Sequence, residues 1–168
     1  ETDNPTGKAD TNDLQYRCDV ANAIKDLDLF VSLHSNAAGS GWSSARGWEI
    51  YASSPGDTAG RNIAAKAIAK RVREAGVTVH GEAVKHERFY VLKNTTAPAV
   101  LIEHGFHTNK EDVALLKAHM APEKQIQAAG GISGFAAAVK FLSLGADRLG
   151  TSRLVEQVKK EADLDGQI

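Results

Sequence analysis

Two polar residues at the ends of apolar runs have side chains that could do chemistry. His34 closes the run LDLFVSLH, and Glu103 follows the apolar residues of PAVLIEHGF. A neutral imidazole can bind a metal ion or move a proton. A carboxyl group held among buried residues keeps its proton to a higher pH, which suits a general base near neutral pH. Two simpler interpretations stay open: a hydrogen-bonded structural histidine, and an ion pair of Glu103 with Lys93 or Arg88.

The elements that must position these residues are short strands separated by helical segments. Near-continuous apolar runs are typical of strands covered on both faces. Such runs predict strands over residues 27–34, 48–53 and 98–106, with shorter β-like stretches at 77–80 and 89–92. Capping residues and apolar residues at helical spacing predict helices over residues 12–25, 58–76, 109–120 and 121–143.

The alternation of strands and helices predicts an α/β fold with a mostly parallel central sheet and helices on both faces. Folds of this kind bind ligands beyond the carboxyl ends of their strands. His34 and Glu103 both lie at such ends, so we expect them to share one site.

The length and composition indicate one compact domain. The chain has 168 residues, and a domain typically has about 100–200. After Gly145 the sequence becomes polar and amphipathic. We therefore expect a domain over residues 1–145, incomplete at its N-terminal side, and a linker or an appended helix over residues 146–168.

Several classes of function are excluded by charge and motif. Because the net charge is -1, no excess of basic residues points to nucleic acid. No apolar run approaches the length of a membrane span. The single Cys18 cannot form an intrachain disulfide or a C-x-x-C motif. The chain also lacks the serine nucleophile elbow, the phosphate-binding loop and the H-E-x-x-H zinc motif.

Three sequence blocks resemble one known family. DLFVSLHSNAA, GWEIYAS and RFYVLKNTTAPAVLIEHGFHTNKED are similar, in order and spacing, to the zinc-dependent N-acetylmuramoyl-L-alanine amidases of the amidase-3 type. The resemblance extends from about Asp13 to Phe141. It implies a hydrolase that cleaves peptidoglycan between N-acetylmuramic acid and the L-alanine of the stem peptide.

The resemblance also implies roles for individual residues. His34 takes the place of a zinc ligand, and Glu103 takes the place of the catalytic carboxylate. The family has two further zinc ligands, which correspond to positions before Glu1. The candidate substrate groove comprises residues that fall on or near the same blocks: Asn36, Trp42, Glu49, Arg88 and His104. Trp42 could stack on a sugar ring.

For the whole protein, the resemblance implies peptidoglycan as the partner and zinc as the cofactor. It implies an extracellular or cell-wall location, reached either as a phage endolysin released at lysis or as a secreted bacterial autolysin. The polar residues after Gly145 suggest a C-terminal wall-binding module. The alternative is a non-catalytic amidase-like domain that binds the cell wall or a partner.

Overall fold

A computed structural model describes residues 12–39, 41–56, 59–119, 127–129, 132, 134–143, 148–151 and 154. The chain divides into two compact units, each built from two separate stretches. The first unit comprises residues 1–34 and 48–104, and the second comprises residues 35–47 and 105–168.

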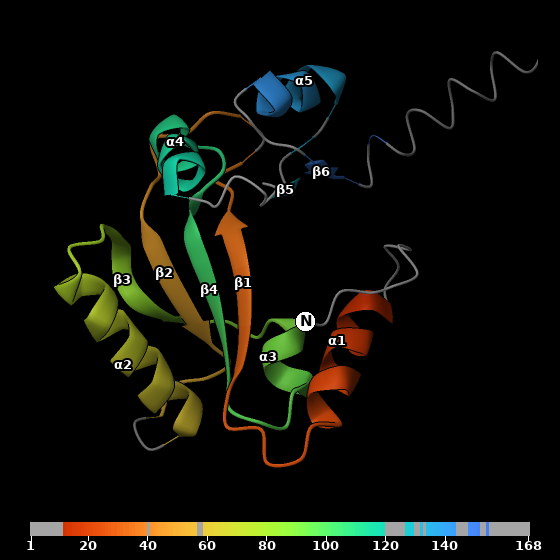
Figure 1. Cartoon of the computed structure of the whole chain (residues 1–168), viewed down its shortest axis with the longest axis vertical. Coiled ribbons are helices and arrows are strands. Elements are labelled where there is room, and N and C mark those ends of the chain that lie inside the picture. The colour runs from red at the N-terminus through yellow and green to blue at the C-terminus, as the bar shows by residue number, and fades with distance from the viewer. Residues whose placement is uncertain are drawn as a thin grey trace, which may run out of the picture. The chain divides into compact units, whose positions relative to one another are not determined.

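The central sheet has four strands. They are β1 (Phe30–Asn36), β2 (Trp48–Ala52), β3 (Val79–His86) and β4 (Ala99–Phe106), in the order β1-β4-β2-β3. Strands β2 and β3 are parallel, whereas β2 and β4 are antiparallel. The predicted α/β fold with a mostly parallel sheet is confirmed (Figure 1).

Strands β1 and β4 run in the same direction. At their starts, the Phe30 amide donates to the Pro98 carbonyl, and at their ends the His107 amide donates to the Asn36 carbonyl. Both bonds are 2.9 Å long. The carboxyl ends of these neighbouring strands therefore lie at the same edge of the sheet.

One face of the sheet is covered by α1 (Asn12–Asn22) and the short helix α3 (Tyr90–Asn94). Cys18 of α1 and Leu92 of α3 pack there against Phe30 and Leu101 of the strands. The two helices are also joined by a hydrogen bond from the Asn22 side-chain amide to the Asn94 carbonyl. Side chains alternate along a strand, so Ala99, Leu101 and Glu103 of β4 all project toward the face that α1 and α3 partly cover.

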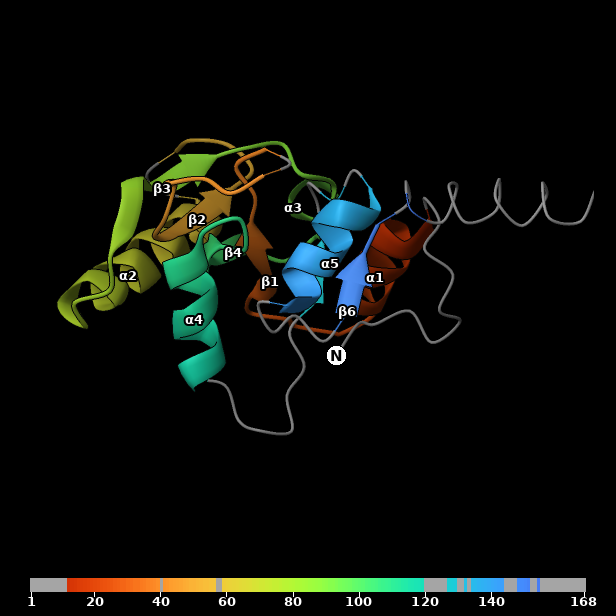
Figure 2. The same ribbon diagram turned by 90° about the horizontal axis from the view of Figure 1, so that it is seen from above.

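The other face is covered by α2 (Gly60–Glu74). Small residues, Ala65 and Ala69, let this helix approach Ile50 and Val100 closely. Figures 1 and 2 both place α2 on the side of the sheet away from α1 and α3. Helices thus cover both faces, as expected.

The segment 89–92 differs from its predicted β conformation. Residues Tyr90–Asn94 form α3, which buries Val91 and Leu92 against α1. Thr95, the residue that follows the helix, closes its last turn, since its Oγ1 donates to the Val91 carbonyl at 2.7 Å. Tertiary burial and this local hydrogen bond outweigh the β preference of aromatic and β-branched residues.

The second unit holds α4 (Lys110–His119), β5 (Gln127–Ala129), α5 (Phe135–Ser143) and β6 (Arg148–Gly150). Strands β5 and β6 pair in parallel, and Figure 2 shows α5 beside β6. The prediction of one helix over 121–143 is wrong for residues 127–129.

The predicted boundary after Gly145 is not tested by the described residues. Within 146–168 only residues 148–151 and 154 are described, and 148–150 form a strand there. Leu154 packs with Ile132 and Phe141 in a small apolar cluster of the second unit.

No helix in the described ranges is both long and apolar enough to cross a membrane.

Candidate functional site

His34 is the fifth residue of β1, and its side chain shares a strand face with Ser32 and Phe30. The Ser32 hydroxyl oxygen lies 2.9 Å from Nε2 of His34, within hydrogen-bonding distance. Partial burial, and then the positive charge of Arg17 on α1, lower the pKa of His34. The imidazole is therefore neutral at neutral pH and retains a lone pair for a proton or a metal ion.

Glu103 is the fifth residue of β4, after four buried apolar residues. Burial raises the pKa of its carboxyl to about 7, with a smaller contribution from the nearby carboxylate of Glu49. Its Oε2 atom is buried and has no hydrogen-bond partner among the described residues. No ion pair of Glu103 with Lys93 or Arg88 is present among the described residues. This carboxyl is poised to exchange a proton near neutral pH.

The strand register brings the two candidate residues opposite each other. The Phe30 hydrogen bond to Pro98 pairs Phe30 with Ala99 in a parallel ladder. Counted from this pair, His34 falls opposite Glu103. The bond at the other end pairs Asn36 with Phe106, so β4 has one more residue than β1 between the two ends. We place this extra residue at Gly105, which has a φ of 79°, because the pairing of β4 with β2 is regular as far as His104. Facing residues of parallel strands project to the same side, here the side that α1 and α3 partly cover.

Glu49 extends this row across the sheet, because it pairs directly with Glu103 on the antiparallel strand β2. Its side chain is only 1% exposed and forms an ion pair with Lys85 of β3. His34, Glu103 and Glu49 therefore form one row over three neighbouring strands. The sequence analysis names His34, Glu103 and Glu49 as candidate residues. It does not predict the ion pair with Lys85, because Glu49 and Lys85 are far apart in the sequence.

His104 and Arg88 lie elsewhere in the first unit. His104 pairs with Trp48 on the strand face opposite to that of Glu103, so β4 separates the two side chains. Arg88 follows the end of β3 and lines a pocket with Pro98, where β4 begins. The structure does not bring these two predicted groove residues together with Glu103.

Asn36 and Trp42 belong to the second unit. The Asn36 side chain accepts a hydrogen bond from the Ala37 amide at 2.7 Å. Trp42 packs against Phe141, with ring centroids 5.9 Å apart, and Lys140 lies over its ring. These contacts hold the half-buried Trp42 within its own unit, and its role in stacking on a sugar ring stays a prediction.

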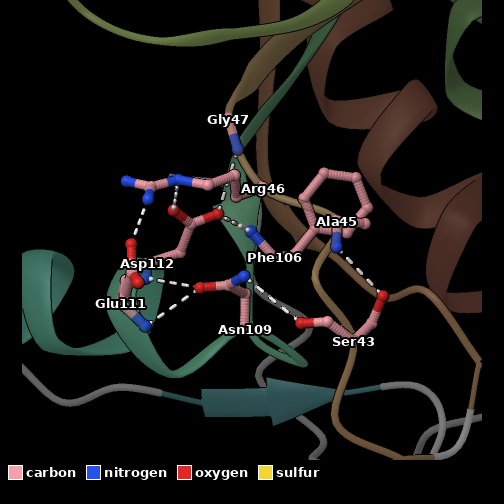
Figure 3. Close-up of polar contacts among 8 residues, drawn as sticks. All are labelled: Ser43, Ala45, Arg46, Gly47, Phe106, Asn109, Glu111 and Asp112. Carbon is pink, nitrogen blue, oxygen red and sulfur yellow. Dashed lines mark hydrogen bonds and ion pairs between the residues drawn. The ribbon is translucent and has the colours of Figure 1, made fainter.

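The second unit contains a buried carboxylate that the sequence analysis does not identify, and it holds two backbone segments together. Asp112 of α4 is 5% exposed, and its Oδ2 accepts hydrogen bonds from the amides of Gly47 and Phe106 at 3.1 and 2.8 Å (Figure 3). Arg46 approaches its other oxygen at 3.9 Å. Asp112 thus ties the end of the loop at 35–47 to the end of β4. The sequence feature that could have indicated this role is the pair of acidic residues, Glu111 and Asp112, in the first turn of the predicted helix.

The side chain of Asn109 caps that helix. Its side-chain oxygen accepts hydrogen bonds from the amides of Glu111 and Asp112 at 2.9 and 3.2 Å. Its amide group donates to the Ser43 carbonyl at 3.2 Å (Figure 3). One side chain therefore caps α4 and fixes the loop before β2.

The residues of the row do not by themselves complete a zinc site. A catalytic zinc ion takes three protein ligands and keeps one position for water. In the part of the chain that the structure describes, no three His, Cys, Asp or Glu side chains gather in a way that could hold a metal ion. His34 and Glu103 have the right donor chemistry, but a complete site needs donors other than the described residues.

Comparison with known families tests the resemblance to amidases that the three sequence blocks suggested. A family model described as N-acetylmuramoyl-L-alanine amidase matches residues 4–134. The chain belongs to this amidase family. The match includes both members of the His34 and Glu103 pair and all four strands of the central sheet.

Two curated relatives agree with membership in the amidase family. The endolysin of Bacillus phage SPP1 is 41% identical over 108 residues, which cover 60% of this chain and 36% of the endolysin. The N-acetylmuramoyl-L-alanine amidase LytC of Bacillus subtilis (strain 168) is 36% identical over 118 residues, which cover 68% of this chain and 22% of LytC. This chain thus spans less than half the length of either relative.

Among solved structures, an N-acetylmuramoyl-L-alanine amidase from Clostridium difficile 630 has a TM-score of 0.51 and is 30% identical. The superposition covers 59% of this chain and 51% of that amidase. It supports the same fold for the amidase-like part of the chain.

A different relative matches a shorter stretch. The deoxyribose-phosphate aldolase of Streptococcus pyogenes serotype M5 (strain Manfredo) is 40% identical over 75 residues, which cover 43% of this chain and 34% of the aldolase.

Proposed function

We propose that this chain carries catalytic residues of a peptidoglycan hydrolase that cleaves the amide bond between N-acetylmuramic acid and L-alanine. The observation that carries the proposal is the position of Glu103. Its carboxyl stands opposite the neutral imidazole of His34 at the carboxyl ends of two parallel strands, and one of its oxygens has no partner in the described structure. Membership in the amidase family supports the same reaction.

Glu103 acts as the general base in this proposal. With a pKa of about 7, a large fraction of its carboxyl groups is ionised at neutral pH. The carboxylate removes a proton from the attacking water, whose oxygen bonds to the lactyl carbonyl carbon. The same carboxyl then gives the proton to the nitrogen of alanine as the carbon–nitrogen bond breaks. No covalent bond to the protein forms.

His34 is our proposed ligand for zinc. The resemblance to zinc-dependent amidases implies this metal, which, when bound, supplies a more acidic water and a polarised carbonyl. The lowered pKa of His34 favours the neutral ring that a metal ion requires. We propose peptidoglycan as the substrate and the cell wall as the place of action, for a phage-released or a secreted bacterial enzyme.

The experiment compares the chain with a Glu103→Gln variant on purified peptidoglycan. Cleavage of this amide releases the amino group of L-alanine without creating reducing sugar ends. We expect wild-type protein supplied with zinc to release amino groups. The variant should be about 100 to 10,000 times slower, because a positioned general base contributes about that factor. Glu74→Gln, which changes the same group on exposed α2, should keep wild-type activity.

A second candidate is a non-catalytic domain that binds the cell wall. It is favoured by the lack of a three-ligand group among the described residues. A chain that sediments with peptidoglycan but releases no amino groups with zinc would support binding and contradict the hydrolase. Stoichiometric zinc that is lost in His34→Ala, measured by elemental analysis, would support the hydrolase.

A further inference from the structure

A second candidate site lies in the first unit, at the end of the sheet where β2 ends and β4 begins. It is a pocket with a volume of about 530 Å³. Ser53 and Ser54, which follow β2, form part of its wall, and Ala99 is the first residue of β4. Glu103 is four residues further along β4, or about 13 Å at 3.3 Å per residue. The pocket is therefore separate from the row of His34, Glu103 and Glu49.

Three cationic side chains line the pocket, and they come from three different segments. Arg61 lies in the first turn of α2, Arg88 follows β3, and Lys93 belongs to α3. None of the residues that line the pocket in the described structure is acidic. Arg88 and Lys93 have no ion-pair partner among the described residues. The pocket thus gathers positive charge that the described part of the protein does not neutralise.

Several hydrogen-bond donors around the pocket are still available. Arg61 donates through one terminal nitrogen to Ser54 Oγ at 2.8 Å, whereas its buried Nε has no partner among the described residues. Because Ser54 accepts that bond, its own hydroxyl proton can be donated elsewhere. The start of α2 also lacks a side-chain cap, since Ala59 occupies the cap position. The amides of Asn62 and Ile63 donate to the Ala59 carbonyl, which leaves those of Gly60 and Arg61 to donate to a ligand within the described structure.

Other polar groups of the pocket are already committed within the protein. Thr95 Oγ1 donates to the Val91 carbonyl, and Thr96 Oγ1 donates to Asn22 Oδ1 at 3.0 Å. The available donors therefore cluster on the side formed by Ser53, Ser54, the start of α2 and the guanidinium of Arg61. On this side, hydroxyl groups of serine, backbone amides and the guanidinium of Arg61 can all donate hydrogen bonds.

We propose that this pocket binds a phosphate group. Three cations from different segments, together with the donors beside Arg61, match an anion that carries more than one charge and several acceptor oxygens. A guanidinium fork and amides at a helix start are both favourable for phosphate oxygens. The group can be carried by a small phosphate ester or by a phosphodiester polymer, and the experiment below distinguishes these sources.

The test measures binding of inorganic phosphate and of glycerol 3-phosphate to the full chain at low ionic strength, by calorimetry. We expect saturable binding at one site. The double variant Arg88→Gln, Lys93→Gln removes two exposed cations from the pocket. It should bind at least about tenfold more weakly, because charge-assisted hydrogen bonds are lost. The control Lys70→Gln, Lys117→Gln removes two exposed cations elsewhere and should change affinity less than about twofold.

A third variant, Arg61→Lys, keeps the charge but removes the planar fork, and it should also weaken binding. Circular dichroism would verify that each variant is folded. A lack of saturable phosphate binding by wild-type protein would overturn the proposal, as would an equal loss of affinity in the control. A synthetic poly(glycerol phosphate) that binds more tightly than glycerol 3-phosphate would identify the polymer as the source, and equal or weaker binding would identify the small ester.

Discussion

Glu103 and Asp112 are both carboxylates withdrawn from solvent, but the protein surrounds them differently. Asp112 accepts hydrogen bonds from two backbone amides and lies near the Arg46 guanidinium. Glu103 has a buried oxygen without a described partner and a carboxylate neighbour, Glu49. Hydrogen bonds hold a charged carboxylate in place, whereas desolvation without them favours proton uptake. The first arrangement fixes the backbone, and the second makes a reactive group.

The largest effect on stability is expected for Asp112→Ala. Removing this carboxylate leaves the amides of Gly47 and Phe106 without their partner in a buried region. We expect the free energy of unfolding to fall by about 2–4 kcal/mol, measured by urea denaturation. Stability within 0.5 kcal/mol of wild type would show that Asp112 is no more structural than Glu103.

Gly105→Ala should have the next largest effect. Gly105 has a φ of 79°, and a Cβ there would lie 2.7 Å from Oδ2 of Asp112. We expect a loss of about 2–3 kcal/mol from backbone strain and displacement of the carboxylate. The matched control is Gly81→Ala, which has a similar φ of 59° but no atom within 4 Å of the added Cβ. Equal losses of unfolding free energy in the two variants would mean that moving the Asp112 carboxylate does not destabilise the protein.

Glu103→Gln should show a smaller effect on stability that depends on pH. The carboxyl has a pKa of about 7 in the folded protein and an ordinary value of 4.5. Folding therefore retains a proton that the unfolded chain releases, and wild-type stability falls as pH rises from 4.5 to 7. Glutamine cannot ionise, so the variant should match wild type at pH 4.5. At pH 8 we expect it to be about 1 kcal/mol more stable, after allowance for solvent screening. Denaturation curves at both pH values measure the difference.

Arg46→Ala should have the smallest effect. Arg46 forms an ion pair with Glu111, but the two side chains are 46% and 70% exposed. We expect a loss of less than about 1 kcal/mol, measured by the same denaturation method. A loss as large as that of Asp112→Ala would mean that the guanidinium, rather than the two amides, holds this carboxylate.

The sequence was sufficient to predict the strands that carry His34 and Glu103, because each residue follows an apolar run. It was insufficient for the direction of β2, which depends on pairing with β4 rather than on the local pattern. The helical conformation at Tyr90–Asn94 was missed for a similar reason, since packing against α1 decides it. Local patterns predict buried strands well, but they do not identify the partner of each strand.

The predicted groove residues show the same limit. His104 is adjacent to Glu103 in sequence, yet strand alternation turns it to the other face. Arg88 lies in a sequence block similar to the family, yet it lines a pocket at the other end of β4. Proximity in sequence is a poor guide to a shared site along a strand, whereas equivalent positions on paired strands are a good one.

The buried ion pair of Glu49 with Lys85 constrains how this protein can vary. Because Glu49 is almost fully enclosed, replacing Lys85 alone removes a cation that balances a buried carboxylate, whereas Lys85 itself is 29% exposed. Exchange of both members for a matched apolar pair avoids that cost. Natural variants should therefore change these two positions in concert, and a library that aims to improve the protein should randomise them together.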